Sequence, residues 1–289
     1  MRPAGRCYTA PVLRIDDDLG RTLSFRGAPR RIVSLVPSDT YSVVALGAGD
    51  RLVGRTTYCE HGDAATVGGT KDTDVDAVIA LEPDLVIANQ EENARKPLEA
   101  LAARGVRVLV SLPRTVEQGV AHLARLARIL EPGAAGKELV RRGYDLASRP
   151  APPTSARAFV PIWMDPLMTL NADTFGSDVL AHAGLANAFG DRMRLYPLAA
   201  DLGKMPEVEA NGRDVRYPRL SLAELTQRDP DVLVLPDEPH AFTADDEAVL
   251  HAAVPRARVI RVVGKDLFWY GAWTIDALDR LAAQLVPGN

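Results

Sequence analysis

Cysteine is scarce in this sequence: only Cys7 and Cys59 occur in 289 residues. Two cysteines cannot build the disulfide framework of a small secreted domain, so a disulfide-stapled scaffold is excluded. Long apolar runs are also missing, and no transmembrane segment is expected. Residues 1–20 contain three arginines and three consecutive aspartates where a signal peptide would have an apolar core. Two placements stay open: cytoplasmic as the chain is written, or periplasmic or cell-surface if a leader was removed.

An excess of positive charge is absent too. The formal net charge is -4, and no run of lysine and arginine could follow a phosphate backbone, which argues against nucleic acid as a partner. Hydrophobic residues make up 47% of the chain and charged residues 25%, as in ordinary globular proteins. The length suits two lobes of ~140 residues each.

The motifs of common enzyme classes are missing. The sequence has no Gly-x-Gly-x-x-Gly or Gly-Lys-Ser phosphate loop, no Gly-x-Ser-x-Gly elbow and no His-Glu-x-x-His pair. Cys59 with His61 is the one candidate nucleophile and base, and residues two apart do not face each other on a helix. We therefore expect that the protein is not an enzyme.

What the sequence does contain is a repeated order of apolar run, polar turn and helical spacing. Short apolar runs of the kind buried in a parallel sheet recur along the chain, and Ala- and Leu-rich helical spacing follows most of them. The runs are residues 31–36, 52–53, 84–88, 106–110, 158–163 and 232–235. Before the first run, the spacing around Gly20 is typical of a hairpin. This order predicts an α/β fold in which helices cover parallel sheets.

A long helical segment divides the chain. Over residues 116–147 an apolar stripe alternates with charged residues, which predicts one connecting helix, with Pro132 and Gly133 as the place where it would be interrupted. The proline cluster that starts at Pro150 ends this segment. We therefore expect an amino-terminal α/β lobe over residues 1–115, the helix over 116–150 and a carboxyl-terminal α/β lobe over 151–289.

The two predicted lobes echo one another. Residues 75–87 and 222–234 share a pattern of short helix, Pro-Asp turn and apolar strand, with Pro83 and Pro230 at equivalent places. One interpretation is a pair of related lobes; the other is that this connection is simply common in α/β proteins. In a pair of such lobes the binding site is expected at the carboxyl ends of the strands.

Several motifs carry a family resemblance. In the first half they are Arg31-Ile-Val-Ser-Leu-Val-Pro-Ser, Leu52-Val-Gly-Arg-Thr-Thr-Tyr-Cys, Val67-Gly-Gly-Thr-Lys-Asp and Leu81-Glu-Pro-Asp-Leu-Val-Ile. In the second half they are Trp163-Met-Asp-Pro-Leu-Met-Thr, Asp237-Glu-Pro-His-Ala-Phe and Gly264-Lys-Asp-Leu-Phe-Trp-Tyr-Gly. In the order and spacing of these motifs the chain resembles the substrate-binding proteins of cobalamin and iron-siderophore ABC importers.

The resemblance implies two Rossmann-like α/β lobes joined by a single long backbone helix, with the ligand cleft between the lobes. It implies a helical-backbone metal receptor, similar to periplasmic binding proteins, that binds a metal chelate: cobalamin, haem or an iron siderophore. Tyr-Cys after the second strand and Trp-Tyr-Gly near the end look most similar to cobalamin binders. We expect no intrinsic cofactor, a monomer, and an ABC permease as a candidate partner.

Tyr58 matches a tyrosine that lines the corrinoid pocket in that family. A flat macrocycle needs aromatic faces and hydrogen-bond donors at its amide rim, and tyrosine offers both. The alternative is a core tyrosine, but Tyr58 lies among polar residues and not in an apolar run. Trp269 and Tyr270 are the second choice, in the aromatic cluster of residues 268–273, where the family has ligand contacts. The alternative for this cluster is packing between the last strand and the final helix.

The remaining candidates share a position, because each follows a predicted strand, where side chains would face the expected site. In the first lobe they are Ser38, Asp39, Cys59, His61, Lys71, Glu92 and Asn93, and in the second they are Trp163, Asp165, Met168, Glu238, His240 and Phe242.

Direct binding of a bare metal ion is a further hypothesis. Cys59, Glu60 and His61 are metal-ligand types, and His240 from the second lobe could join them, but Cys-x-His spacing does not specify zinc. His61 or His240 could instead ligate the open axial position of a chelated metal.

Permease docking in the family uses one carboxylate on each lobe, at a fixed distance before the Pro-Asp turn. These positions hold Asp76 and Ala223 here. The adjacent Glu224 is the candidate substitute, although a shift of one residue on a helix rotates a side chain by about 100°.

We therefore predict a solute-binding protein, the substrate-binding component of an ABC-type importer, for a metal chelate, with cobalamin or another corrinoid first. One alternative is a cytoplasmic iron-siderophore or haem carrier or sensor that is not coupled to a permease, and another is a direct transition-metal binder. A purely structural or protein-interaction role would leave the aromatic and polar loop residues unexplained.

Overall fold

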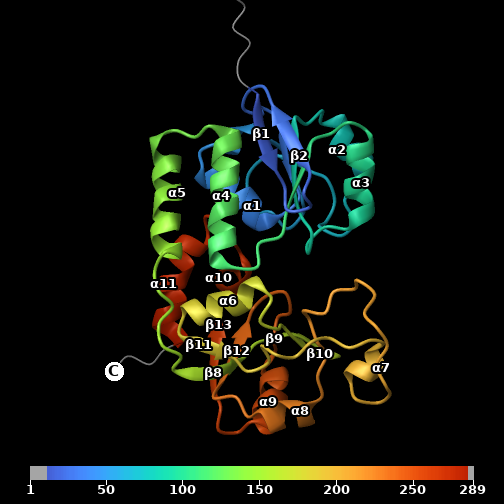
Figure 1. The fold of residues 1–289 in the computed structure, drawn as a ribbon, viewed down its shortest axis with the longest axis vertical. Helices are drawn as coiled ribbons and strands as arrows, with labels where there is room; N and C mark the ends of the chain where they lie inside the picture. The colour runs from blue at the N-terminus through green and yellow to red at the C-terminus, as the bar shows by residue number, and fades with distance from the viewer. Residues whose placement is uncertain (1–11, 286–289) are drawn as a thin grey trace, which may run out of the picture. The chain divides into compact units, whose positions relative to one another are not determined.

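The computed structural model describes residues 12–285, so Cys7 lies outside the described residues. The chain divides into two compact units (Figure 1). Unit 1 comprises the residues up to Leu112 together with Ala121–Arg142, and unit 2 comprises Pro113–Val120 together with the residues from Gly143 onward. Each unit has its own parallel sheet, which confirms the predicted α/β class. Within the described range, no helix has both the length and the apolar character needed to cross a bilayer.

Unit 1 contains a five-stranded sheet in which all neighbouring strands are parallel. Its strands, in spatial order, are β5 (Ala65–Thr66), β4 (Leu52–Arg55), β3 (Ile32–Ser34), β6 (Leu85–Asn89) and β7 (Val108–Ser111). The helices that connect them are α1 (Pro37–Ala45), α2 (Val75–Ala80) and α3 (Arg95–Ala103). Strands β3, β6 and β7 are buried along their whole length. Burial on both faces explains why these strands appear in the sequence as continuous apolar runs.

An antiparallel hairpin precedes this sheet, as predicted. Strand β1 (Leu13–Asp16) pairs with β2 (Thr22–Phe25). Asp17 is buried in the turn, where its carboxylate accepts a hydrogen bond of 2.6 Å from the guanidinium of Arg21. Gly20 adopts a φ of 75°, a left-handed conformation that glycine accepts without a steric cost.

Two helices take the place of the single connecting helix that the sequence predicted. They are α4 (Val116–Leu130) and α5 (Ala134–Ala147). The backbone N–H of Glu131 still donates to the carbonyl of Ala127 at 2.9 Å, but Pro132 has no N–H to continue the series. Glu131 also adopts a left-handed φ of 53°, which turns the chain. The expectation of one backbone helix is therefore corrected to a pair of helices.

Unit 2 contains a four-stranded sheet, also parallel throughout. Its strands, in spatial order, are β11 (Leu185–Asn187), β8 (Ala156–Phe159), β12 (Val232–Pro236) and β13 (Arg258–Val262). The helices of this unit that follow α5 are α6 (Phe175–His182), α7 (Leu198–Asp201), α8 (Leu222–Arg228), α9 (Ala244–Ala253), α10 (Gly264–Phe268) and α11 (Thr274–Leu285).

The predicted strand over residues 158–163 is two strands. Strand β8 ends at Phe159, and a separate strand β9 (Pro161–Met164) pairs antiparallel with β10 (Leu167–Thr169) outside the parallel sheet. Pro161 cannot donate a backbone hydrogen bond, so it ends the ladder of the parallel sheet at this point. The correction matters for the site, because three of the predicted residues lie in this β9–β10 hairpin and its turn.

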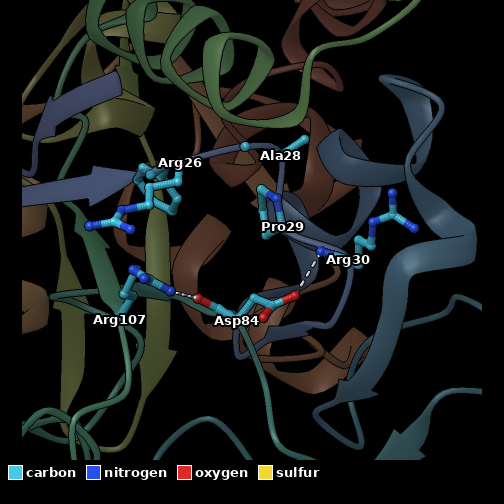
Figure 2. A pocket seen from close by; sticks show the side chains of 8 residues that line it. Arg26, Ala28, Pro29, Arg30, Asp84 and Arg107 are labelled. Carbon is cyan, nitrogen blue, oxygen red and sulfur yellow. Dashed lines mark hydrogen bonds between the residues drawn. The ribbon is translucent and has the colours of Figure 1, made fainter. Parts of the chain in front are cut away.

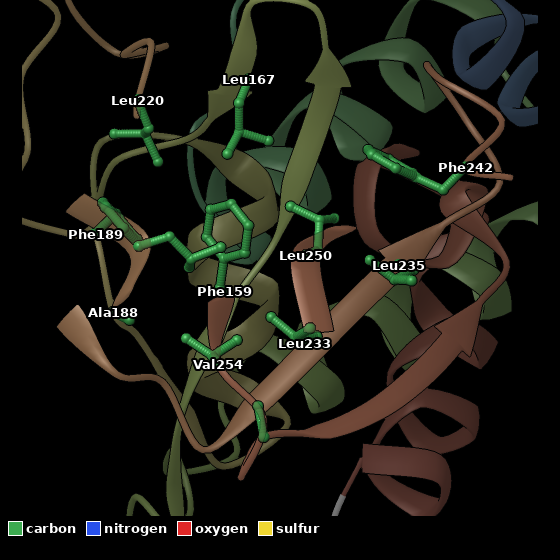
Figure 3. Close-up of a cluster of buried hydrophobic side chains, with 12 residues drawn as sticks. Phe159, Leu167, Ala188, Phe189, Leu220, Leu233, Leu235, Phe242, Leu250 and Val254 are labelled. Carbon is green, nitrogen blue, oxygen red and sulfur yellow. The ribbon is translucent and has the colours of Figure 1, made fainter. Parts of the chain in front are cut away.

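A cluster of buried apolar side chains forms a core of unit 2 (Figure 3). At its centre the rings of Phe159 and Phe189 lie 5.2 Å apart, and both are fully buried. Full burial of one such side chain stabilises the fold by about 1.5–3 kcal/mol. The cluster also includes Leu167 of the β9–β10 hairpin and Phe242 of the loop after β12. The core therefore anchors two segments that carry predicted site residues.

The repeated pattern of short helix, Pro-Asp turn and strand is present in both units. Helix α2 leads through Pro83 into β6, and α8 leads through Pro230 into β12. The residue before each proline, Glu82 or Asp229, has a left-handed φ, of 43° and 42°. The repeated sequence pattern therefore corresponds to a repeated backbone conformation.

Candidate functional site

The carboxyl edge of the unit 1 sheet brings predicted residues together on neighbouring loops. Parallel strands end at the same edge, so the loops that follow them lie close to one another. Ser38 and Asp39 follow β3, Tyr58 to His61 follow β4, Lys71 follows β5, and Glu92 and Asn93 follow β6.

Tyr58 is the most accessible of these residues, with 66% of its surface exposed. Its loop is held by the guanidinium of Arg55, which donates to the carbonyls of Thr56 at 3.1 Å and Cys59 at 3.0 Å. Gly69 makes room for the ring, because a Cβ there would lie 3.3 Å from Cε2 of Tyr58 and 2.2 Å from Oδ1 of Asp72. A core position for Tyr58 is excluded, and its role in binding stays a prediction.

Cys59 is buried beneath this loop. Its Sγ atom lies 3.1 Å from the hydroxyl oxygen of Thr40 and 3.1 Å from that of Thr56. His61 packs beside Gly49, where a Cβ would approach its Nε2 to 3.1 Å. Residues 12–285 contain no group of His, Cys, Asp and Glu side chains placed to hold a metal ion. The structure therefore gives the direct metal hypothesis no support.

Lys71, Glu92 and Asn93 connect the loops after β5 and β6. The ammonium of Lys71 donates to the carbonyl of Glu91. Asn93 is buried and donates to the carbonyls of Leu35 and Thr70, both at 3.0 Å. Loss of water around the Glu92 carboxyl raises its pKa, although part of the residue stays exposed, and Lys71 opposes that shift. Asn93 thus fixes the loops, and the charges of Lys71 and Glu92 lie close together on them.

Ser38 and Asp39 lie inside the protein at the start of α1. The carbonyl of Ser38 accepts a bond of 3.0 Å from the hydroxyl of Ser42, and Oδ1 of Asp39 lies 2.8 Å from Nε2 of His122. Both residues are buried. They hold α1 in place and present no surface to a ligand in this structure.

In unit 2, three aromatic rings contact one another in series at the carboxyl edge of the sheet. The ring of Trp163 lies 5.2 Å from that of His240, and His240 lies 4.7 Å from Phe242. Trp163 is 45% exposed, and its indole N–H donates to the carbonyl of Asp165 at 3.0 Å. Phe242 is part of the core, so this series of three rings connects the core with the exposed ring of Trp163.

Nε2 of His240 is buried and lies 3.5 Å from Oδ2 of Asp246. Its ring supports that of Trp163, and its role as an axial ligand stays a prediction. Glu238 lies against Gly264, where a Cβ would meet Cγ of Glu238 at 2.4 Å. Glycine is thus required at position 264 for the loop after β12 to approach α10.

Trp269 and Tyr270 differ in their surroundings. Tyr270 is 5% exposed and packs edge-on against Phe175 at 6.1 Å, as in the packing alternative for this cluster. Trp269 is half-buried, with its ring 5.3 Å from Trp273 and the ammonium of Lys265 4.7 Å above it. Trp269 alone of this predicted pair keeps surface for a ligand.

The two predicted docking residues also differ. Asp76 on α2 is exposed and forms an ion pair with Arg104. Glu224 on α8 is largely covered, and its carboxylate accepts a bond of 2.9 Å from Nε of Arg192. Glu224 is therefore already engaged inside unit 2.

A hollow of about 310 Å³ lies elsewhere in unit 1, at the amino ends of the strands (Figure 2). Figure 2 shows Asp84 between Arg107 and the backbone of Arg30. The Oδ2 atom of Asp84 accepts a bond of 2.8 Å from the N–H of Arg30, which closes the start of β3 onto β6. This open hollow shares no residue with the predicted site.

The sequence analysis missed Arg219, which lies opposite Met168, and Arg194, whose charge acts on Arg219; both lie in the segment between β11 and α8. The extended residues 218–220 pair with β10, and Arg219 lies opposite Met168. The segment contains several arginines, and this density of positive charge is the signal that would have drawn attention to it.

Two units with parallel sheets, each presenting an exposed ring at its carboxyl edge, define a binding protein of the two-lobed α/β class. Residues 32–250 match the family model described as periplasmic binding protein, and the chain belongs to that family. It is a family of binding proteins, which confirms the prediction that this chain is not an enzyme.

Curated relatives carry a name that points to a ligand. The vitamin B12-binding protein of Photorhabdus laumondii is 34% identical over 182 residues, which are 60% of this chain and 66% of the relative. The vitamin B12-binding protein of Yersinia pestis strain Pestoides F is 30% identical over 178 residues, 59% of this chain and 64% of the relative. The match therefore spans slightly less than two thirds of these relatives.

Solved structures share the fold. The periplasmic vitamin B12 binding protein of Vibrio cholerae matches with a TM-score of 0.67 and 22% identity, over 89% of this chain and 96% of that chain. The periplasmic haem-binding protein of Roseiflexus matches with a TM-score of 0.68 and 21% identity, over 89% and 97%. At such identities the likeness establishes the two-lobed fold alone.

Proposed function

We propose that this chain is the substrate-binding component of an ABC-type importer and binds one metal chelate, with cobalamin or another corrinoid as the first candidate. The observation that carries the proposal is an exposed ring at the carboxyl edge of each sheet, Tyr58 in unit 1 and Trp163 in unit 2. A flat macrocycle is bound by aromatic faces with polar groups at its rim. Relatives named for vitamin B12 binding support a corrinoid as the guest.

A second candidate is a haem or iron-siderophore carrier or sensor that is not coupled to a permease. The docking positions favour it, because Ala223 has no carboxylate and Glu224 is engaged by Arg192. The similarity in fold to a haem-binding protein is compatible with this function.

Native mass spectrometry tests the proposal. The full chain is mixed separately with cobalamin, haemin and a panel of ferric siderophores, and retention of one intact chelate per chain is the expected result. Zinc and ferric salts without a chelator are the control, and we expect neither to be retained. Loss of every chelate under conditions that keep the chain folded would contradict the proposal.

A further inference from the structure

Three side chains form a row at the edge of unit 2. Met168 of β10 lies opposite Trp163 of β9 on one side and opposite Arg219 on the other. Residues directly opposite one another in antiparallel strands point to the same face, about 4.5–5.5 Å apart. An indole, a thioether and a guanidinium therefore stand on one face, over a span of roughly 10 Å.

The hydrogen bonds around Arg219 fix this register. The N–H of Thr169 donates to the carbonyl of Pro218 at 3.1 Å, and the N–H of Leu220 donates to the carbonyl of Leu167 at 2.8 Å. Met168 and Arg219 therefore form a non-hydrogen-bonded pair, the kind in which side chains lie closest. Leu167 and Leu220 alternate with them and belong to the buried core cluster. The row consequently faces away from the core.

The positive charge of Arg219, at the end of this row, is only partly compensated by hydrogen bonds and nearby carboxylates. The guanidinium of Arg219 is half-buried and donates to the carbonyl of Tyr217 at 3.1 Å, and its other nitrogens have no hydrogen-bond partner within residues 12–285. Arg194 is also half-buried, with its guanidinium 4.5 Å above the ring of Tyr196 and no hydrogen-bond partner in the described part of the chain. Two partly desolvated cations thus lie near the exposed aromatic surface.

The nearest carboxylate is already committed. Asp201 is buried and lies 3.0 Å from Nη1 of Arg192, and it also accepts from the backbone N–H groups of Leu195 and Arg219. Burial lowers the pKa of Arg219, the nearby charge of Arg194 lowers it further, and Asp201 only partly compensates. A second anion would therefore stabilise this pair of guanidinium groups.

We infer that Arg219, supported by Arg194, binds an anionic group of the chelate while Trp163 and Met168 contact its flat face. The inference rests on the proposed function and deepens it: the guest carries a phosphodiester, as cobalamin does, or a carboxylate, as haem does. Guanidinium forks fit both groups with paired hydrogen bonds. A chelate whose rim is neutral would accept only single hydrogen bonds from them, without the charge-assisted pair.

Paired ligands with and without the anionic group test this inference by isothermal calorimetry. Cobalamin is compared with cobinamide, which lacks the phosphodiester together with the ribose and base attached to it, and haemin with its dimethyl ester, which lacks free carboxylates. We expect Arg219→Gln to weaken binding of the anionic member of the bound pair about tenfold or more and to leave its neutral partner nearly unchanged. Arg219→Lys, which keeps the charge but loses the fork, is expected to fall between wild type and Arg219→Gln.

Arg213→Gln is the matched control. Arg213 also stacks on Tyr196, at 3.9 Å, but its guanidinium already donates to the carbonyls of Ala210 and Glu209. We expect this variant to bind like wild type. An equal loss for the anionic and the neutral ligand, or no loss in Arg219→Gln, would overturn the inference and leave the proposed function standing. Failure of wild type to bind any of the four ligands would remove the inference, and the siderophore panel would then decide the proposed function.

Discussion

Asp84 and Asp231 occupy equivalent places in the two units and share one hydrogen bond to the neighbouring strand. Oδ2 of Asp84 accepts from the backbone N–H of Arg31 at 3.0 Å, and Oδ2 of Asp231 accepts from that of Arg157 at 2.8 Å. The side chain of Arg31 donates to the carbonyl of Leu81 at the end of α2, at 2.9 Å. The side chain of Arg157 donates to the carbonyl of Arg228 at the end of α8, also at 2.9 Å. Helix end, turn and neighbouring strand are thereby joined in the same way twice.

Replacing either aspartate should destabilise the fold. Asp84→Ala and Asp231→Ala each leave strand-initiating N–H groups without their acceptor, which we expect to cost about 1–3 kcal/mol in the free energy of unfolding. Urea denaturation measures the change. Asp63→Ala, at an exposed loop position, is the control and should stay within about 0.5 kcal/mol. Equal behaviour of all three variants would contradict a structural role for the pair.

Truncating Tyr58 should weaken ligand binding. We expect Tyr58→Ala to reduce the affinity for the bound chelate by about 1–2 kcal/mol, because an exposed aromatic contact is lost, and Tyr58→Phe to retain most of it. Titration calorimetry measures both. Tyr144→Ala removes another exposed tyrosine, on α5 and outside the predicted site, and should bind like wild type. Unchanged affinity in Tyr58→Ala would remove this residue from the site.

Trp163 should report on the ligand directly. A metal chelate placed against the indole is expected to quench its fluorescence, and Trp163→Phe should abolish most of the quenching while it keeps an aromatic face. The control is Trp273→Phe, because Trp273 donates to Asp266 at 2.8 Å within the packing of α10 and α11. If the two variants quench alike on chelate addition, Trp163 does not contact the guest.

Acid should weaken the start of α9 through Asp246. Hydrogen bonds from the backbone and hydroxyl of Thr243 lower the pKa of this carboxyl, so its stabilising contribution is present above the unfolded pKa of ~3.9 and is lost as the pH falls through the lower folded value. We expect Thr243→Ala to cost about 1 kcal/mol at pH 7 and clearly less near pH 2. Urea denaturation at both pH values measures this.

Ser221→Ala is the matched control for that pH dependence. Ser221 begins α8 and accepts from the N–H of Glu224 at 3.2 Å, but it lacks the reciprocal bond from an acidic side chain that Thr243 has. Its cost should be similar at both pH values. A pH-independent cost in Thr243→Ala would show that the bond between the Thr243 hydroxyl and the Asp246 carboxylate adds nothing that depends on charge.

The sequence predicted the fold well where local pattern and burial agree. Continuous apolar runs became parallel strands because strands buried on both faces need no alternation. The pattern failed where one residue changes the backbone. Pro161 ends a strand whose apolar character continues past it, and Pro132 ends the helical stripe at the interruption that the sequence had already indicated.

The candidate site was predictable by position but not by exposure. The loops after the strands were expected, yet whether a loop side chain points outward depends on contacts with distant segments. Ser38 and Tyr270 proved buried, whereas Tyr58 and Trp163 are exposed. Arg219 gains its place from pairing with Met168, a register that distant hydrogen bonds set and no local pattern encodes.

Helices α4 and α5 each begin in one unit and end in the other, so neither unit is a contiguous stretch of chain. A gene fragment that stops at Leu112 would encode unit 1 without residues 121–142, and a fragment that starts at Gly143 would encode unit 2 without residues 113–120. Each fragment would lack part of the unit that it encodes. Exchange of lobes between family members would therefore have to carry the paired helices along, and recombination at a single crossover would break both halves.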